Sequence, residues 1–266
     1  MYSTFTLTYK YVLHWLTASS KKGHGIHSPF VFDFAQKLLK PVALESSLQR
    51  IETIRNAYLN DHHTSIEMED RGAGSRTSSS SNRTVSAIAR SALKSPRLAH
   101  LLHRMIHLYQ IDSVLELGTS LGITTRYLAE AQPRFGVWSI EGAPGMADFT
   151  RQRMRKEGYE HVRILTGDFS DHLESVVSTM NGRKLIFIDG NHRYAPTVHY
   201  FNSLLPYIKD EDIVVVDDIH WSQEMEDAWG DLKKNERTSC FIDLFFIGIV
   251  FFRKDFKEKQ GFAIRF

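Results

Sequence analysis

The sequence predicts an α/β fold: a doubly wound, mostly parallel sheet of seven strands, preceded by an N-terminal helical region. The first observation is that short apolar runs alternate with amphipathic stretches from Ser113 onward. The second is that two apolar runs at the end follow each other too closely for a helix between them. The third is that residues 1–95 carry helix-start signals. Such β-α alternation is typical of a parallel sheet with crossover helices on both faces.

The N-terminal region, residues 1–95, is expected to be helical with one long flexible loop. Ser28-Pro29 and Ser95-Pro96 each place a capping hydroxyl before a proline suited to the first helical turn. In residues 67–83, glycine, serine and charge replace the apolar periodicity, which predicts a mobile loop. The loop is either a surface linker or a lid over an active site, and the sequence leaves both alternatives open.

Residues 96–266 are expected to form the sheet domain. Its first five strands are SVLEL, GVWSI, VRILT, KLIFI and IVVV. One more amphipathic stretch follows, and then come CFIDLFF and IGIVFFRK with Gly248 between their apolar blocks. Two adjacent strands without an intervening helix must pair antiparallel, so we predict an antiparallel strand at an edge of the sheet.

The composition limits the classes of function. The 33 Lys and Arg residues nearly balance the 31 Asp and Glu residues, so no global basic field favours a nucleic-acid partner. The single cysteine, Cys240, lies in an apolar run and fits a reducing compartment. The N-terminus is a poor signal peptide, and the apolar stretch from Cys240 to Phe252 is too short to span a bilayer. We therefore expect a cytoplasmic protein without a membrane partner.

Acidic residues end five consecutive predicted strands. In an open parallel sheet, ligands bind outside the carboxyl ends of the strands. Exposed acids that serve only solvation would scatter among loop positions, so this row predicts a binding rim for a cation or a molecule with many hydrogen-bond donors. The acids are Glu116, Glu141, Asp168, Asp189 and the pair Asp217-Asp218.

The turn after the first strand has the character of a nucleotide-binding turn in a Rossmann-like fold. Gly118 and Gly122 allow the backbone to turn sharply before a helix N-terminus. Glu141 follows Gly122 by 19 residues at the end of the second strand, where a carboxylate can accept both hydroxyls of a ribose. Ser120 stands where a dinucleotide fold has its middle glycine. A nucleoside without a pyrophosphate fits better, although a dinucleotide-dependent oxidoreductase stays an alternative.

The segments ELGTSLG, WSIEG, LTGDF, FIDGNHRY and VVVDDIHW, in this order, resemble the motif series of class I S-adenosylmethionine (SAM)-dependent methyltransferases. They are most similar to those of small-molecule O-methyltransferases of the catechol and caffeoyl-CoA type. The resemblance covers roughly residues 100 to 250 and is more specific for cofactor and fold than for substrate.

The resemblance implies SAM as cofactor and assigns the residues that bind it. Gly118 and Gly122 would lie under the methionine part, with Glu116 near its ammonium group. Glu141 would hold the ribose, Asp168 would accept from the adenine amino group, and Phe169 would flank the ring. The complete set of implied cofactor residues is Glu116, Gly118, Thr119, Ser120, Gly122, Glu141, Gly142, Asp168, Phe169 and Asp189.

The resemblance also implies a divalent cation held by Asp189, Asp217 and Asp218. Three oxygen ligands suit a hard cation such as Mg²⁺, which keeps waters for a substrate to displace. Asp218 departs from the family pattern, which has asparagine there. The extra carboxylate is consistent either with tighter cation binding or with loss of the metal, and both alternatives stay open.

A base is needed to deprotonate the acceptor, and His192 stands three residues after Asp189, where the related enzymes have a lysine. Imidazole titrates near neutral pH and is suited to this role. The alternative for His192 is a loop histidine that only hydrogen-bonds a neighbouring carboxylate. His220, two residues after Asp218, is the rival base or an extra metal ligand.

The function expected from these residues is SAM-dependent O-methylation of a small molecule, with His192 and Asp189 in the catalytic group. The alternatives are methylation of nitrogen or of a macromolecule, an NAD-dependent oxidoreductase, and a non-catalytic binding protein. A homodimer is suggested by the resemblance and by the aromatic N-terminus. His100, His103 and His107 recur at helical spacing and are expected to lie at the edge of the core rather than to bind a metal.

Overall fold

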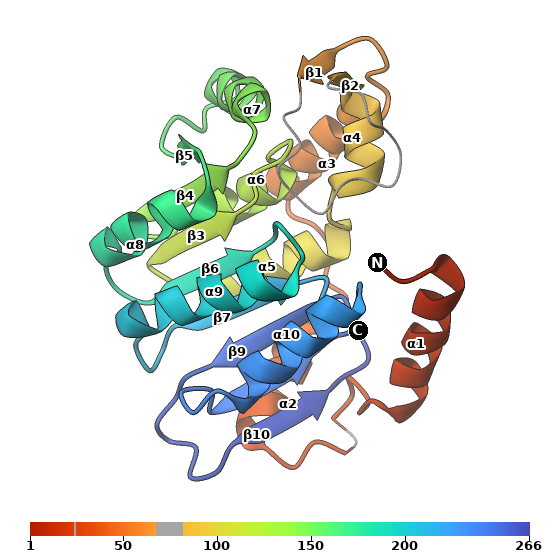
Figure 1. Cartoon of the computed structure of the whole chain (residues 1–266), viewed down its shortest axis with the longest axis vertical. Helices are drawn as coiled ribbons and strands as arrows, with labels where there is room; N and C mark the ends of the chain where they lie inside the picture. The colour runs from red at the N-terminus through yellow and green to blue at the C-terminus, as the bar shows by residue number, and fades with distance from the viewer. Residues whose placement is uncertain (24, 68–81) are drawn as a thin grey trace. The chain divides into compact units, whose positions relative to one another are not determined.

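The computed structural model describes residues 1–23, 25–67 and 82–266 (Figure 1). These residues form two compact units. The continuous unit consists of residues 43–184, and the split unit combines residues 1–42 with residues 185–266. Most of the predicted loop at 67–83 lies outside the described residues, so its assignment as a linker or a lid stays a prediction.

The continuous unit contains three parallel strands in the order β3-β4-β5. All five residues of β3 are buried, as expected for a parallel strand covered on both faces. A core of aliphatic and aromatic side chains joins α3, α4 and α6 around Leu48, Ile88 and Tyr127. The elements are α3 Ser46–Leu59, β1 Ser65–Glu67, β2 Asn82–Thr84, α4 Val85–Ala92, α5 Pro96–Leu108, β3 Ser113–Leu117, α6 Ile123–Glu130, β4 Gly136–Glu141, α7 Pro144–Lys156, β5 Arg163–Thr166 and α8 Phe169–Thr179.

The split unit contains strands in the order β6-β7-β9-β8-β10. Strands β6 and β7 pair in parallel, β9 pairs antiparallel with both β7 and β8, and β10 pairs in parallel with β8. The elements are α1 Thr4–Thr17, α2 Pro29–Leu38, β6 Lys184–Ile188, α9 Tyr194–Leu204, the 3₁₀ turn Leu205–Tyr207, β7 Ile213–Asp217, α10 Gln223–Lys234, β8 Cys240–Asp243, β9 Ile247–Phe251 and β10 Gln260–Ala263.

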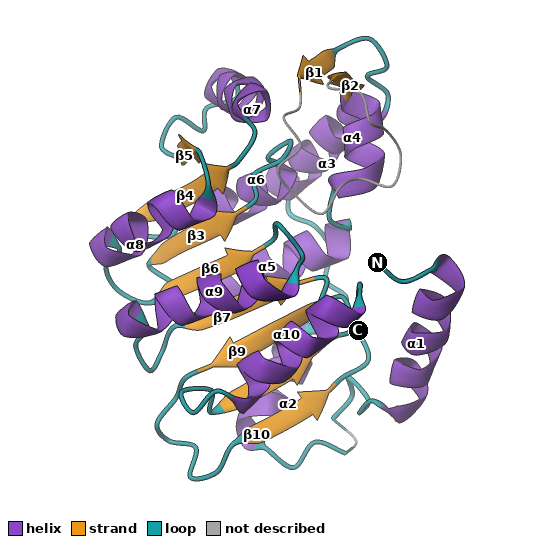
Figure 2. Cartoon of the chain, in the orientation of Figure 1, coloured by secondary structure: helices purple, strands orange, loops and turns teal. Residues whose placement is uncertain are grey.

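The predicted fold class is confirmed: helices and mostly parallel strands alternate along the chain (Figure 2). All seven predicted strands are present as β3 to β9. The pair β8-β9 is antiparallel as predicted, but β9 lies between β7 and β8 rather than at an edge. The edge belongs to β10, which the sequence analysis did not predict. Its residues alternate between half-buried and exposed, so it lacks the continuous apolar run that marks the other strands.

The predicted N-terminal helices are also present, and they are divided between the two units. Helices α1 and α2 belong to the split unit, and α3, α4 and α5 belong to the continuous unit. Ser95 caps α5 by accepting from the Leu98 N–H, whereas Ser28 makes no capping hydrogen bond at α2. The short antiparallel pair β1-β2 was not predicted. Within the described residues, we find no helix with the length and apolar character needed to cross a membrane.

Candidate functional site

The turn between β3 and α6 is shaped by residues with left-handed backbone. Gly118, Ser120 and Gly122 have φ angles of 107°, 47° and 69°. A Cβ at Gly122 would stand 2.6 Å from Thr150 Cγ2, so this position requires glycine for space as well as for conformation. The Gly118 N–H donates to the Ile140 carbonyl at 2.9 Å. The β3 turn is thereby tied to β4.

Glu141 ends β4 and binds the same turn. Its Oε2 accepts from the Ser120 N–H at 2.8 Å, and its Oε1 accepts from the Ala143 N–H at 3.0 Å. Burial raises the pKa of this carboxyl, and the backbone N–H donors offset only part of that shift. The structure therefore brings Glu141 and Ser120 together, as the motif series implies.

Glu116, in contrast, is enclosed inside the unit, with no exposed surface. Its Oε2 accepts from Thr125 Oγ1 at 2.5 Å and from Ser139 Oγ at 2.6 Å, and burial raises its pKa to about 7. Thr119 Oγ1 lies 2.6 Å from the same Ser139 hydroxyl. The sequence analysis overlooked Thr125 and Ser139. A hydroxyl in the middle of an apolar strand was the available signal for Ser139.

Three further implied cofactor residues lie at the surface of the continuous unit. Gly142 follows Glu141 and is half-buried, and a Cβ there would meet no atom within 4 Å. Asp168 is exposed and caps α8, because its Oδ1 accepts from the Ser170 N–H at 2.9 Å. Phe169 is half-buried and is the first residue of α8. The capping bond uses one carboxylate oxygen of Asp168 and leaves the other for a ligand.

In the split unit, Asp189, His192 and Asp217 form one group whose ligand atoms all lie within 4.8 Å of one another. His192 Nε2 is 3.8 Å from Asp189 Oδ1. Asn191 and His192 both have positive φ angles, 69° and 37°, so the loop after β6 folds back and carries His192 toward Asp189. Two of the three predicted metal ligands are therefore together, with the predicted base beside them.

Asp218 is not part of that group. It has a φ of 54°, and its N–H donates to the Phe246 carbonyl at 2.7 Å. Its side chain lines a small cavity of about 80 Å³ with Leu7, His220 and Trp221 among the other lining residues. Asp218 thus has a left-handed backbone and lies outside the group of Asp189, His192 and Asp217, which the sequence analysis did not foresee.

The donor set fits a divalent cation. Two carboxylates and an imidazole are ligands that Mn²⁺, Fe²⁺ and Zn²⁺ accept, whereas Mg²⁺ prefers oxygen alone. Magnesium would therefore use Asp189 and Asp217 and leave His192 available as a base. A softer ion would also recruit His192.

His220, the rival base, has both ring nitrogens engaged. Nδ1 lies 2.9 Å from Glu226 Oε1, and Nε2 lies 2.9 Å from Asp243 Oδ2. An imidazole held between two carboxylates has no free nitrogen to take a proton from a substrate. Among the described residues, His100, His103 and His107 belong to neither candidate metal group. His103 is buried, and burial lowers its pKa to about 4.

Comparison with protein families finds a methyltransferase match in the middle of the chain. A family model described as a methyltransferase domain matches residues 115–219, which run from β3 to just beyond β7. This match confirms the resemblance that the motif series indicates.

Individual relatives agree with that class. The chain is 30% identical over 128 residues to a catechol O-methyltransferase from Niastella koreensis, covering 47% of this chain and 57% of that protein. It is 33% identical over 79 residues to a protein-L-isoaspartate O-methyltransferase from Ignicoccus hospitalis, covering 29% of this chain and 37% of that protein. The matches thus span less than two thirds of either relative.

A solved structure shows the same fold over most of the chain. It is the O-methyltransferase from Bacillus cereus in complex with S-adenosylhomocysteine (SAH), with a TM-score of 0.53 and 17% sequence identity. The alignment covers 84% of this chain and 97% of that chain.

Proposed function

We propose that this protein is a SAM-dependent methyltransferase that methylates a hydroxyl oxygen of a small molecule. The observation that carries the proposal is the β3 turn. Glycines and a left-handed Ser120 form it, and the Glu141 carboxylate at the end of β4 binds it. This arrangement lies in the segment that matches the methyltransferase family. We also propose that residues 96–266 form the functional methyltransferase domain.

On the cofactor side, Glu141 accepts the ribose hydroxyls while the Ser120 and Ala143 N–H groups continue to donate to it. A ligand ribose can use carboxylate lone pairs that these donors leave open, since an ionised carboxylate offers about four. Gly118 and Gly122 let the methionine part approach the backbone, and the rest of the implied set follows the motif series. Glu116 is enclosed, so its effect on the cofactor is indirect. It binds the Ser139 hydroxyl, which lies beside Thr119 of the turn.

On the acceptor side, Asp189 and Asp217 hold the divalent cation and His192 takes the proton. A cation held there would lower the pKa of an acceptor hydroxyl. His192 Nε2 would take the proton of that hydroxyl, and the acceptor oxygen would then bond to the methyl carbon of SAM as the carbon–sulfur bond breaks and SAH leaves. The protein supplies orientation and a base.

Calorimetric titration with SAH tests the cofactor class. We expect micromolar binding, about −8 kcal/mol, with or without metal. NAD serves as the matched negative control, and binding of NAD without binding of SAH would replace the proposal with the oxidoreductase alternative. Absence of binding by both ligands would favour a non-catalytic protein.

Two histidine variants test the base. His192→Ala is expected to keep SAH affinity and to lose turnover with a catechol-type acceptor by about 10²- to 10⁴-fold. His199→Ala, a substitution on α9 outside the site, controls for general effects of removing a histidine. A His192→Ala enzyme with unchanged turnover across pH would refute the base assignment.

Methylation of a protein carboxyl group is the second candidate. Three curated relatives named as protein-L-isoaspartate O-methyltransferases match segments of this chain. Transfer of labelled methyl from SAM to an isoaspartyl peptide, measured beside transfer to a catechol, separates the two candidates. The relative at 57% coverage is a catechol enzyme, so we expect the catechol to be the better acceptor.

A further inference from the structure

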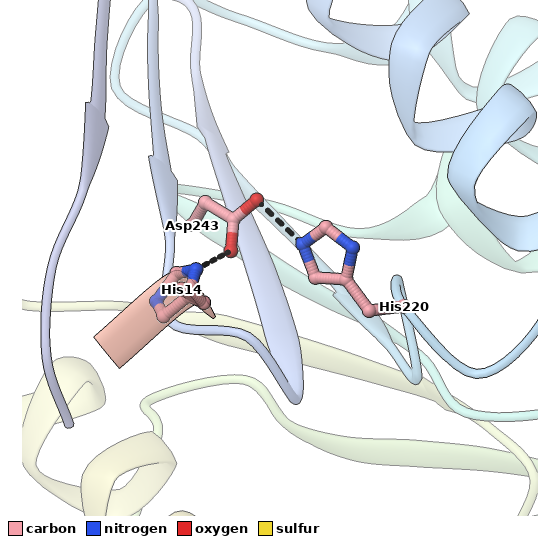
Figure 3. A group of neighbouring side chains, drawn as sticks. All are labelled: His14, His220 and Asp243. Carbon is pink, nitrogen blue, oxygen red and sulfur yellow. Dashed lines mark hydrogen bonds and ion pairs between the residues drawn. The ribbon is translucent and has the colours of Figure 1, made fainter. Parts of the chain in front are cut away.

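A second group of metal-binding side chains lies in the split unit, apart from the proposed catalytic residues. His14 comes from α1, His220 from the segment after β7, and Asp243 from the end of β8 (Figure 3). His14 Nδ1 is 3.7 Å from Asp243 Oδ1, and His220 Nε2 is 2.9 Å from Asp243 Oδ2. One ligand atom from each residue lies within 4.8 Å of the others. Figure 3 shows both imidazoles facing the same carboxylate.

These distances suit an ion with tetrahedral coordination. Ligand atoms about 2.0–2.2 Å from a zinc ion are about 3.3–3.6 Å from one another. The observed separations of 3.7 Å and 2.9 Å lie on either side of that range, so small side-chain rotations bring all three atoms into place. Two imidazoles and one carboxylate form a donor set that zinc binds in proteins, with a water in the fourth position.

The surroundings orient the ligands as metal sites require. A metal-binding histidine usually donates its other ring N–H to a carboxylate or a carbonyl, and His220 Nδ1 faces Glu226 Oε1 at 2.9 Å. The His220 ring stacks on Phe245, with centroids 5.0 Å apart and planes at 21°. Asp243 accepts from the Trp229 indole N–H at 3.1 Å and from the Phe245 backbone N–H at 2.9 Å. These contacts fix the orientations of the His220 ring and the Asp243 carboxylate.

The local charge also favours a cation. Asp243 and Glu226 are two carboxylates, and Lys10, whose Nζ is 2.9 Å from Glu226 Oε2, is one ammonium. The ammonium balances one of the two carboxylates, so a bound cation would balance the other.

Helix α1 needs an attachment of this kind. None of its residues is buried, and Phe5, Tyr9 and Leu16 are 84%, 62% and 61% exposed. Aromatic packing on the rest of the unit is limited to the inner face, where Tyr11 contacts Phe245 and Phe246 with ring centroids 5.1 and 5.6 Å apart. Polar links from α1 to the rest of the unit include Lys10 to Glu226, His14 to Asp243 and the Leu16 carbonyl, which accepts from Arg265.

We propose that His14, His220 and Asp243 bind a zinc ion that fastens α1 to the split unit. The ion replaces the proton between His220 Nε2 and Asp243 Oδ2, and that proton leaves to solvent. The site is distinct from the cation proposed at Asp189 and Asp217, and it is structural rather than catalytic.

Zinc content per chain tests the proposal. The full-length protein is stripped of metal, equilibrated with zinc, desalted and measured by plasma mass spectrometry. The His14→Ala variant is expected to hold one zinc fewer than the wild type, while His27→Ala, at an exposed histidine of the same unit, holds as much as the wild type. The same measurement on His192→Ala reports independently on the other group. Equal zinc in the wild type and His14→Ala would overturn the site, as would a wild type without zinc.

A ligand exchange guards against a folding defect in His14→Ala. Cysteine also binds zinc and cobalt, so His14→Cys is expected to restore the lost equivalent. With Co²⁺ it should add a sulfur-to-metal charge-transfer band that the wild type lacks. Trp229 fluorescence should respond to zinc in the wild type and in His14→Cys, because its indole donates to Asp243, and should not respond in His14→Ala. If His14→Cys has the far-ultraviolet circular dichroism of the wild type but does not bind the ion, the proposal is refuted.

Discussion

Replacement of Glu141 by alanine is the sharpest test of the cofactor assignment. The carboxylate is half-buried at the end of β4 and accepts from the backbone N–H groups of Ser120 and Ala143. A hydrogen bond to a charged acceptor contributes about 1.5–3 kcal/mol. Loss of even one such bond to a ribose hydroxyl therefore weakens SAH binding by roughly 10- to 150-fold, at 1.4 kcal/mol for each factor of ten.

The assay must separate the missing acceptor from a distorted turn. Thr150→Val provides the matched control, because Thr150 Oγ1 donates to the Ser120 carbonyl at 2.6 Å without being an acceptor for ribose. Calorimetry on both variants should give a large loss for Glu141→Ala and a change within about threefold, or under 1 kcal/mol, for Thr150→Val. If Glu141→Ala binds SAH as the wild type does, or if the two variants lose equal affinity, the ribose assignment fails.

Three further substitutions address stability, measured by urea unfolding. The pKa of Glu116 is raised from 4.5 to about 7, so the folded state binds an extra proton between these values. This group alone lowers wild-type stability by about 3 kcal/mol as pH rises through them, and Glu116→Gln should remove that contribution. Arg126→Met should cost about 3–5 kcal/mol, because the buried guanidinium pairs with Glu157 at 2.7 Å. Gly248→Ala should cost about 1–3 kcal/mol, because its Cβ would stand 2.6 Å from the ring of Trp229.

Each of these has a control. Glu174→Gln, at an exposed helical site, should leave the pH dependence of the wild type intact. Arg90→Ala, also exposed, should change stability by less than about 0.5 kcal/mol. Gly230→Ala adds a Cβ that meets no atom within 4 Å on helix α10, and it should stabilise the protein by up to about 1 kcal/mol. Equal effects of a variant and its control would refute the corresponding argument.

The sequence predicted the features that depend on local pattern. The strands from β3 to β9 were predictable because each is a continuous apolar run, and the turn at Gly118 was predictable from its place between a strand and a helix. Strand β10 was missed because only its partner β8 gives it the extended form, through the register Gln260↔Cys240. Half-exposed strands of four residues carry little local signal.

The site was predicted by residue type more accurately than by geometry. Asp189, His192 and Asp217 are grouped, but the left-handed backbone at Asp218 decides where its carboxylate points, and an aspartate tolerates that conformation without any mark in the sequence. The contact of His14 with Asp243 joins residues more than 200 positions apart. No periodicity reports such a pairing, so only the folded chain shows it.

The interrupted course of the split unit determines the order in which the protein can be completed during synthesis. Residues 43–184 emerge as one stretch that contains every element of the continuous unit, and domains generally fold as units on the growing chain. Residues 1–42 are made before this stretch, yet the Lys10 partner Glu226 and the Ser19 partners Ala263 and Arg265 are made after it. Helix α1 can therefore take its place only after the whole continuous unit has been synthesised.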